Sequence, residues 1–126
     1  MKLNLYLTQE KELKIQQDLI LRAKNTNIIN CYIYDEDDFY VNITGMTVYF
    51  MVKEQPSDDD DNAKIDIEIT DFSDSQNGQV DIELSDTDTE DLEGNYVYEI
   101  KIKDTENKIY TIAEGNICFQ RSISGI

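Results

Sequence analysis

Runs of carboxylates are the feature of this sequence whose residue types and spacing could support chemistry. Four consecutive aspartates occupy positions 58–61, and a second acidic run, DTDTEDLE, follows at positions 86–93. Calcium binds several oxygen ligands held by a defined loop, so both runs are candidate calcium sites. The candidate ligands are Asp58, Asp60, Asp86 and Asp88.

The spacing of both runs departs from that of an EF-hand, whose loop has glycine at its sixth position and glutamate at its twelfth. Counted from Asp58, these positions hold Ala63 and Ile69, and counted from Asp86 they hold an aspartate and a valine. The first run is therefore expected to be a solvated loop. Weak calcium binding between the acidic loops is the alternative.

A structural role explains the second acidic run. Ser85 or Asp86 can cap a short helical turn, because carboxylates are stabilised at the positive end of the helix dipole. Leu92 is then expected to enter the core, and Gly94 to free the backbone before a strand that starts at Tyr96. We interpret this run as the connection into that strand.

Catalysis finds little support in the remaining residue types. The sequence has no histidine, which excludes histidine-based triads and histidine zinc ligands. It has no glycine-rich phosphate loop and no nucleophile-elbow motif. The carboxylate pairs that glycoside hydrolysis needs are not marked out by spacing. We therefore expect a protein that is not an enzyme and has no cofactor.

The charge balance limits the partners. With 27 acidic and 11 basic residues, the formal net charge is −16, which repels nucleic-acid phosphates and anionic lipid surfaces. The sequence shows neither a membrane-spanning apolar run nor the apolar core of a secretory signal, so we expect folding in a cytosol. Cys31 and Cys118 are accordingly expected to be buried free thiols, with a disulfide as the alternative.

Short segments of alternating apolar and polar residues predict strands along most of the chain. In one of them, Ile65, Ile67 and Ile69 alternate with Asp66 and Glu68. Similar patterns occupy residues 29–34, 48–53, 80–84, 96–103 and 109–119. Alternation of this kind gives a sheet one dry and one solvated face, which is typical of antiparallel sheets packed face to face. The sequence therefore predicts an all-β fold, a single antiparallel β-sandwich of the immunoglobulin-like type.

Residues 1–126 are expected to form one domain, with residues 1–25 as a possible N-terminal arm. The arm alternates apolar residues like a strand, yet it is rich in good helix formers, so a strand and a short helix both remain open. Asn77 and Gly78 are expected to form the hairpin or bulge turn between the strands on either side. Residues 104–107 are expected to link the next two strands.

Two sets of side chains are candidates for an interface. The strand over residues 47–52 is apolar on both faces, which indicates a strand covered on both sides or lying at an interface. Tyrosines gather in the first half of the chain, and they serve both as strand residues and as recognition surfaces. The candidate interface residues are Thr47, Tyr49, Met51, Tyr32, Tyr34 and Tyr40.

The order of these segments resembles a known family. The stretches ITGMTVYF and DTDTEDLEGNYVYEIKIKD, followed by a TIAEGNICF ending, resemble the immunoglobulin-like β-sandwich of tailed-bacteriophage virion proteins. The pattern is similar to the N-terminal domain of phage baseplate upper proteins. The matching segments are residues 41–52, 78–84, 86–89, 94–104 and 111–119.

The resemblance implies a non-enzymatic virion component that acts by protein–protein docking. Baseplate upper proteins continue into long C-terminal regions, whereas this sequence ends at Ile126, so a tail, neck or head-decoration position is equally expected. Its partners would be other phage structural proteins, with several copies per virion or a homo-oligomer. The alternative function is a surface-recognition module that binds carbohydrate, with or without calcium.

Overall fold

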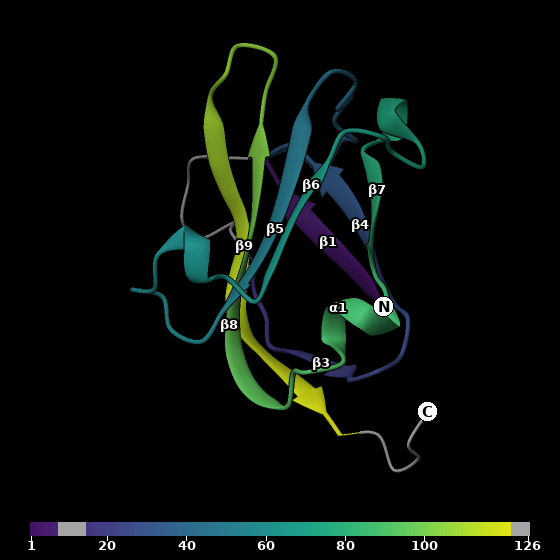
Figure 1. The fold of residues 1–126 in the computed structure, drawn as a ribbon. Helices are drawn as coiled ribbons and strands as arrows, with labels where there is room; N and C mark the ends of the chain where they lie inside the picture. The colour runs from purple at the N-terminus through teal and green to yellow at the C-terminus, as the bar shows by residue number, and fades with distance from the viewer. Residues whose placement is uncertain (8–14, 122–126) are drawn as a thin grey trace.

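The computed structural model describes residues 1–7 and 15–121, which form two β-sheets packed face to face (Figure 1). The smaller sheet has the order β1 (Lys2–Tyr6), β4 (Asn27–Tyr34) and β7 (Gln79–Leu84). The larger sheet has the order β2 (Ile15–Gln16), β9 (Ile109–Gln120), β8 (Gly94–Lys103), β5 (Thr47–Lys53) and β6 (Ile65–Ile69), and β3 (Leu19–Arg22) also pairs with β9. The predicted all-β sandwich is confirmed.

One apolar core lies between the sheets, built from alternate residues of each strand. Ile29, Cys31 and Ile33 of β4 are buried, while Asn30 and Tyr32, which alternate with them, face outward. Removing such side chains from water is the main favourable term in folding. Cys31 is a buried free thiol as predicted, whereas the free thiol Cys118 is only half-buried.

The N-terminal segment forms strands, but it does not pair in the antiparallel manner predicted. β1 runs parallel to β4, and both β2 and β3 run parallel to β9. The chain therefore contributes first to the smaller sheet and then to the larger one. Alternation of apolar residues predicts which side chains face the core, but it is the same for either strand direction. Residues 8–14, where part of the helix alternative fell, lie outside the described residues.

Asn77 and Gly78 lie in a tight turn, but the predicted hairpin between the flanking strands is wrong. β6 belongs to the larger sheet and β7 to the smaller one, so the chain crosses between the layers here. The 3₁₀ turn η3 (Ser75–Asn77) ends at Gly78, whose φ is 68°. A Cβ at Gly78 would lie 2.5 Å from the carbonyl oxygen of Ile33, so only glycine allows this close approach to β4.

The second acidic run has the predicted structural role. It forms α1 (Asp86–Thr89), with Ser85 as its N-cap. The Ser85 hydroxyl accepts a hydrogen bond from the Asp88 amide at 3.1 Å, and the Asp88 carboxylate accepts one from the Ser85 amide at 2.9 Å. This reciprocal pair satisfies amides that have no partner within the helix. Leu92 enters the core, with 6% of its surface exposed.

Residues 104–107 connect β8 to β9 in a hairpin, as expected. One carboxylate oxygen of Asp104 accepts hydrogen bonds from the amides of Glu106 and Lys108, each at 2.9 Å. Asn107 adopts a φ of 65°, a conformation that asparagine tolerates better than most residues. The side chain of Asp104 therefore fixes the turn that aligns the two longest strands.

Candidate functional site

Three tyrosine rings form a row on the outer face of the smaller sheet. Tyr6 at the end of β1 pairs with Tyr34 at the end of β4, and Tyr34 pairs on its other side with Tyr40. The ring centroids of Tyr6 and Tyr34 are 5.9 Å apart, and those of Tyr34 and Tyr40 are 5.2 Å apart in a stacked arrangement. We call these three residues the tyrosine row. Tyr34 and Tyr40, both predicted for an interface, are thus brought together.

A turn of four acidic residues, 35–38, holds one end of the row in place. One carboxylate oxygen of Asp35 accepts hydrogen bonds from the amides of Asp37 at 2.9 Å and Phe39 at 3.0 Å. The hydroxyl of Tyr6 hydrogen-bonds the Asp38 carboxylate, which raises the pKa of Tyr6 above its ordinary value. We call residues 35–38 the acidic turn. It connects β4 to the row's third ring and carries the carboxylates that border the row.

Tyr32, a third predicted interface residue, lies on the same outer face of β4. The ammonium nitrogen of Lys2 lies 4.7 Å from the centroid of the Tyr32 ring, which is a cation–π distance. Further along this face, the Asn30 amide donates a 2.9 Å hydrogen bond to Asp81 of β7. The outer face of the smaller sheet therefore combines half-buried and exposed rings with carboxylates, and a lysine contacts one of the rings.

The other predicted interface residues lie on the opposite side of the sandwich. Thr47, Tyr49 and Met51 face outward from β5 in the larger sheet and are half-buried. Tyr49 is directly opposite Lys101 on one side and Glu68 on the other. Charged side chains of both signs therefore flank the apolar residues of β5. The structure does not join these three residues to the tyrosines of the smaller sheet.

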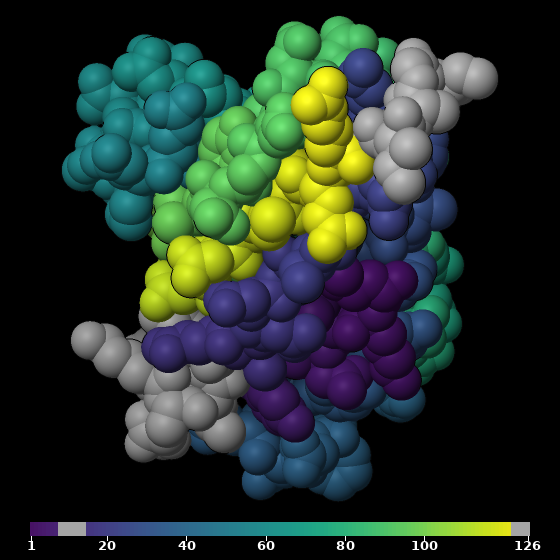
Figure 2. Space-filling view, turned by 90° about the horizontal axis from the view of Figure 1, so that it is seen from below, coloured from purple at the N-terminus to yellow at the C-terminus, as the bar shows by residue number. Residues whose placement is uncertain are grey.

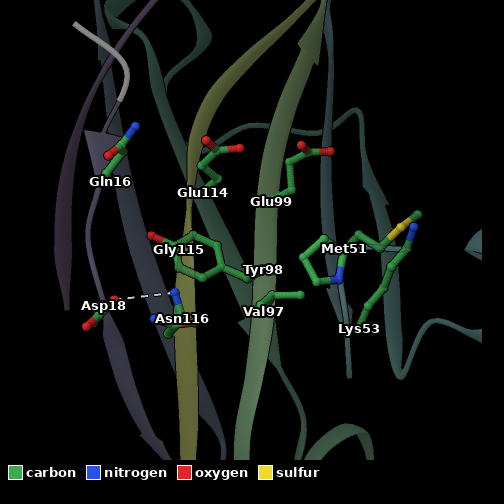
Figure 3. Close-up of a pocket in the computed structure, with 11 residues that line it drawn as sticks. Gln16, Asp18, Met51, Lys53, Val97, Tyr98, Glu99, Glu114, Gly115 and Asn116 are labelled. Atoms are coloured by element: carbon green, nitrogen blue, oxygen red, sulfur yellow. Dashed lines mark hydrogen bonds between the residues drawn. The ribbon is translucent and has the colours of Figure 1, made fainter. Parts of the chain in front are cut away.

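A groove of about 570 Å³ also opens on the larger sheet, next to the link between β2 and β3, which runs along the edge of β9 (Figure 3). Gln16 and Asp18 line one side, and Met51 and Lys53 line the other. Figure 3 shows the carboxylates of Glu99 and Glu114, which are directly opposed on β8 and β9, on one side of Tyr98. Three carboxylates and one lysine make this groove net acidic, so a basic group fits it best.

The floor of the groove is held by two close contacts. The Tyr98 hydroxyl donates a hydrogen bond to the Gln17 carbonyl, and burial, with a contribution from Asp18, raises the pKa of Tyr98 to about 12. A Cβ at Gly115 would lie 2.6 Å from the same carbonyl oxygen and 3.3 Å from the Tyr98 ring, so glycine is needed for Tyr98 to reach Gln17 across β9. The Asp18 carboxylate accepts a hydrogen bond from the Asn116 amide at 3.3 Å.

The first pair of calcium candidates is engaged by a lysine. The carboxylate of Asp60 lies 2.7 Å from the ammonium of Lys53, which also donates to the main-chain oxygen of Asp58 at 2.9 Å. The hydrogen bond between the Lys53 ammonium and the Asp60 carboxylate lowers the pKa of Asp60 and raises that of Lys53. The Asp58 carboxylate accepts from the Gln55 amide at 3.1 Å. These contacts organise the loop around η2 (Asp60–Asn62).

The second pair caps α1. Asp88 completes the capping box with Ser85, and Asp86 accepts a hydrogen bond from the Thr87 amide at 3.0 Å. Within residues 1–7 and 15–121, no group of three or more histidine, cysteine, aspartate or glutamate side chains is placed to hold a metal ion. The carboxylates of these candidates serve as hydrogen-bond acceptors for the backbone and for Lys53.

Some residues of these surfaces were not predicted. Tyr6 joins the row only because β1 is parallel to β4, and Asp18 reaches the groove only because β2 and β3 pair with β9. The alternating pattern of β8 could have placed Glu99 on the outer face, since Ile100 and Ile102 beside it are buried. The local sequence pattern does not indicate which distant strand pairs with β8.

None of the described helices is long and apolar enough to cross a membrane.

No family model matches the chain, and no curated protein matches it. Sixteen chains of solved structures do match. One is the N-terminal domain of phage TP901-1 ORF48, with a TM-score of 0.54 and 15% sequence identity over 94% of this chain and 98% of that one. This chain therefore has the fold of a phage protein domain.

Proposed function

We propose that the protein is a non-enzymatic structural component of a tailed-bacteriophage virion and acts by protein–protein docking. The observation that supports it most is the likeness of the fold to the N-terminal domain of phage TP901-1 ORF48, over 94% of this chain. The likeness extends over nearly the whole of both chains. A tail, neck or head position is compatible with this fold.

The surfaces of the sandwich suit docking. The tyrosine row presents Tyr40 with 56% of its surface exposed, next to Phe39 with 69% exposed. Exposed aromatic side chains are enriched where proteins bind one another. The net charge of −16 keeps free subunits soluble and apart until a partner with complementary charge covers part of the surface.

The proposal assigns no catalytic step to the groove. Glu99 forms an ion pair with Lys101 at 3.4 Å, and Asp18 accepts the Asn116 amide. The sequence offers no histidine as a general base. We assign the groove to contact with a neighbouring protein in the particle, where its acidic character favours a basic group.

The proposal can be tested by removing the protein from the phage that encodes it. An amber codon in place of Lys24 would stop synthesis in a host without a suppressor tRNA. In the host without a suppressor, we expect electron microscopy to show particles that lack a defined part. In a suppressor host, we expect complete particles. Complete, infectious particles without the protein would contradict the proposal. The control is Tyr110→Phe, a substitution that is expected to leave assembly unchanged.

A further inference from the structure

The tyrosine row is an ordered surface. Tyr6, Tyr34 and Tyr40 occupy adjacent positions across β1, β4 and the segment that follows the acidic turn. Tyr6 and Tyr34 are inclined by 37°, and Tyr34 and Tyr40 by 28°. The Tyr34 hydroxyl donates to the Asn4 side chain at 3.4 Å, which anchors the central ring. Figure 2 shows the purple residues of β1 beside a blue projection formed by the part of the chain that contains this turn.

The acidic turn fixes the two most exposed rings of this surface. The Asp35 amide donates to the Phe39 carbonyl at 2.8 Å, and Asp38 takes a φ of 65° that closes the turn. The Val41 amide then donates to the Ile33 carbonyl at 3.0 Å, which returns the chain to β4. Phe39 and Tyr40 are therefore held outward before any partner arrives. A surface ordered in advance loses less conformational entropy on binding.

The charge around the row defines what can cover it. The acidic turn supplies four carboxylates in sequence at one end, and Asp81 and Glu83 of β7 face the same side of the sheet. A second copy of this chain would bring the same acidic surface against itself in a two-fold dimer, which like charge disfavours. Nucleic acid and anionic lipid are repelled for the same reason. A basic protein segment is the occupant that the charge favours.

The structure already contains one contact of the required kind. On the same face of β4, the Lys2 ammonium lies 4.7 Å from the centroid of the Tyr32 ring. A guanidinium would suit the row better, since it stacks on aromatic rings and pairs with carboxylates at the same time. The row and the turn place ring faces and carboxylates side by side for that purpose.

We propose that the tyrosine row and the acidic turn are a docking site for a basic, arginine-bearing segment of a partner protein. The inference rests on the proposed function in that the partner would be another protein of the virion. Arginine side chains would lie on the exposed ring of Tyr40 and pair with carboxylates of the acidic turn. Phe39 would cover the apolar part of the same segment.

The proposal is tested by NMR titration of the whole, ¹⁵N-labelled chain. The probe is the peptide acetyl-Gly-Arg-Gly-Arg-Gly-amide, and its control replaces each arginine with citrulline, which is neutral and nearly isosteric. Salt of about 0.15 M screens long-range attraction to the acidic protein. We expect amide shifts concentrated at residue 6 and residues 34–40 with the arginine peptide, and none with the citrulline peptide.

Matched variants separate the row from general electrostatic attraction. Tyr40→Ala is expected to weaken binding roughly two- to fivefold, the loss of an exposed cation–π contact, while Tyr49→Ala on the larger sheet leaves it unchanged. Asp37→Asn should weaken binding more than Asp66→Asn, which removes the same charge from β6. Tyr40 is exposed and Tyr49 is half-buried on the outer face, so neither substitution removes a core side chain, and the other amide signals report whether each variant is folded.

Three outcomes would overturn the proposal. One is a set of shifts spread over all acidic surfaces, with Asp37→Asn and Asp66→Asn equal in effect. Another is a response of the row to a neutral glycan, chitohexaose, with none to the arginine peptide. The third is concentration-dependent broadening of the row without peptide, which would indicate a second copy as occupant. Each of these leaves the presence of the protein in virions unaffected, so the proposed function is judged separately.

Discussion

The hydroxyl of Tyr98, on β8, donates a hydrogen bond to the main-chain carbonyl of Gln17, which lies 81 residues earlier between β2 and β3. The bond connects the N-terminal segment to the centre of the larger sheet across β9. Gly115 of β9 pairs with Tyr98, and a Cβ there would be 2.6 Å from the same carbonyl oxygen. The N-terminal segment is therefore anchored at a specific point on the sandwich.

Tyr98→Phe is expected to destabilise the protein by about 0.5–1.5 kcal/mol, the net contribution of one hydrogen bond. The ring stays in place, so the loss should appear mainly as faster amide exchange in β2 and β3. Urea unfolding and hydrogen exchange measure the two effects. Tyr110→Phe, at a half-buried position on β9, is the control and should change stability by less than about 0.5 kcal/mol. Equal effects would show that the bond to Gln17 adds no stability.

Stability is expected to fall at high pH because of Tyr98. Burial raises its pKa from 10.0 to about 12, while in the unfolded chain the phenol ionises near its ordinary value. Between pH 10 and 12 the unfolded state therefore loses this proton first, and the free energy of unfolding decreases as the pH rises. Buried Cys31, whose pKa is raised from 9.0 to about 12, adds a fall that begins near pH 9.

The measurement is the free energy of unfolding from urea curves at several values between pH 8 and 11.5. The curve of Tyr98→Phe should be flatter than that of the wild type above pH 10, because the variant has no phenol at this position. Parallel curves would show that repulsion among the acidic residues, and not the buried phenol, determines the alkaline limit of stability.

Gly78→Ala is expected to destabilise the sandwich more than Gly94→Ala. Both glycines have positive φ, 68° and 94°, so both substitutions strain the backbone. Only the new Cβ at Gly78 meets main-chain atoms, the oxygens of Ile33 at 2.5 Å and Val41 at 2.9 Å, whereas nothing lies within 4 Å at Gly94. We expect a difference of about 1–3 kcal/mol by urea unfolding, the usual range for overpacking.

The contrary result for these glycines would be an equal loss of stability. It would mean that the turn at η3 moves away from β4 without cost. In that case the amides of Ile33 and Val41, which hold the segment leading out of the acidic turn, should show new NMR shifts in Gly78→Ala alone.

Ser85→Ala is expected to lower stability by about 1 kcal/mol, because it removes the hydroxyl that caps α1. The Asp88 amide then loses its 3.1 Å hydrogen bond. Ser57→Ala, in the exposed loop before η2, is the matched control and should have almost no effect. Thermal unfolding of both variants tests the assignment, and identical midpoints would mean that the capping box does not stabilise the entry into β8.

Alternation along the sequence was sufficient to predict the inward residues of β4, β7 and β8, whereas β5 is apolar on both faces and its inward residues were not assigned. The helical turn at residues 86–89 was predicted from its capping residues, because a cap such as that of Ser85 acts locally. The pairing of strands could not be predicted in this way, since period-two alternation specifies which face of a strand is buried and not which strand lies beside it. The turn at Asn77 and Gly78 has the residues of a hairpin, yet the apolar faces of β6 and β7 are buried in different sheets.

The candidate site was predictable to a smaller degree for the same reason. Tyr34 and Tyr40 are close in sequence, and the acidic turn between them brings their rings together. Tyr6 joins them from 28 positions away through parallel pairing, which no local pattern reports. The groove depends on the parallel pairing of β2 and β3 with β9, and the hydrogen bond from Tyr98 to Gln17 holds the link between these two strands.

Quantitative mass spectrometry of purified phage particles tests the central claim most directly. Labelled peptides from β5 and β8 would give the number of copies of the protein per virion, with a known capsid protein as the internal standard. A virion component that docks on a symmetric particle is expected at a multiple of three, five, six or twelve copies. Particles that are infectious and contain no copies would contradict the account.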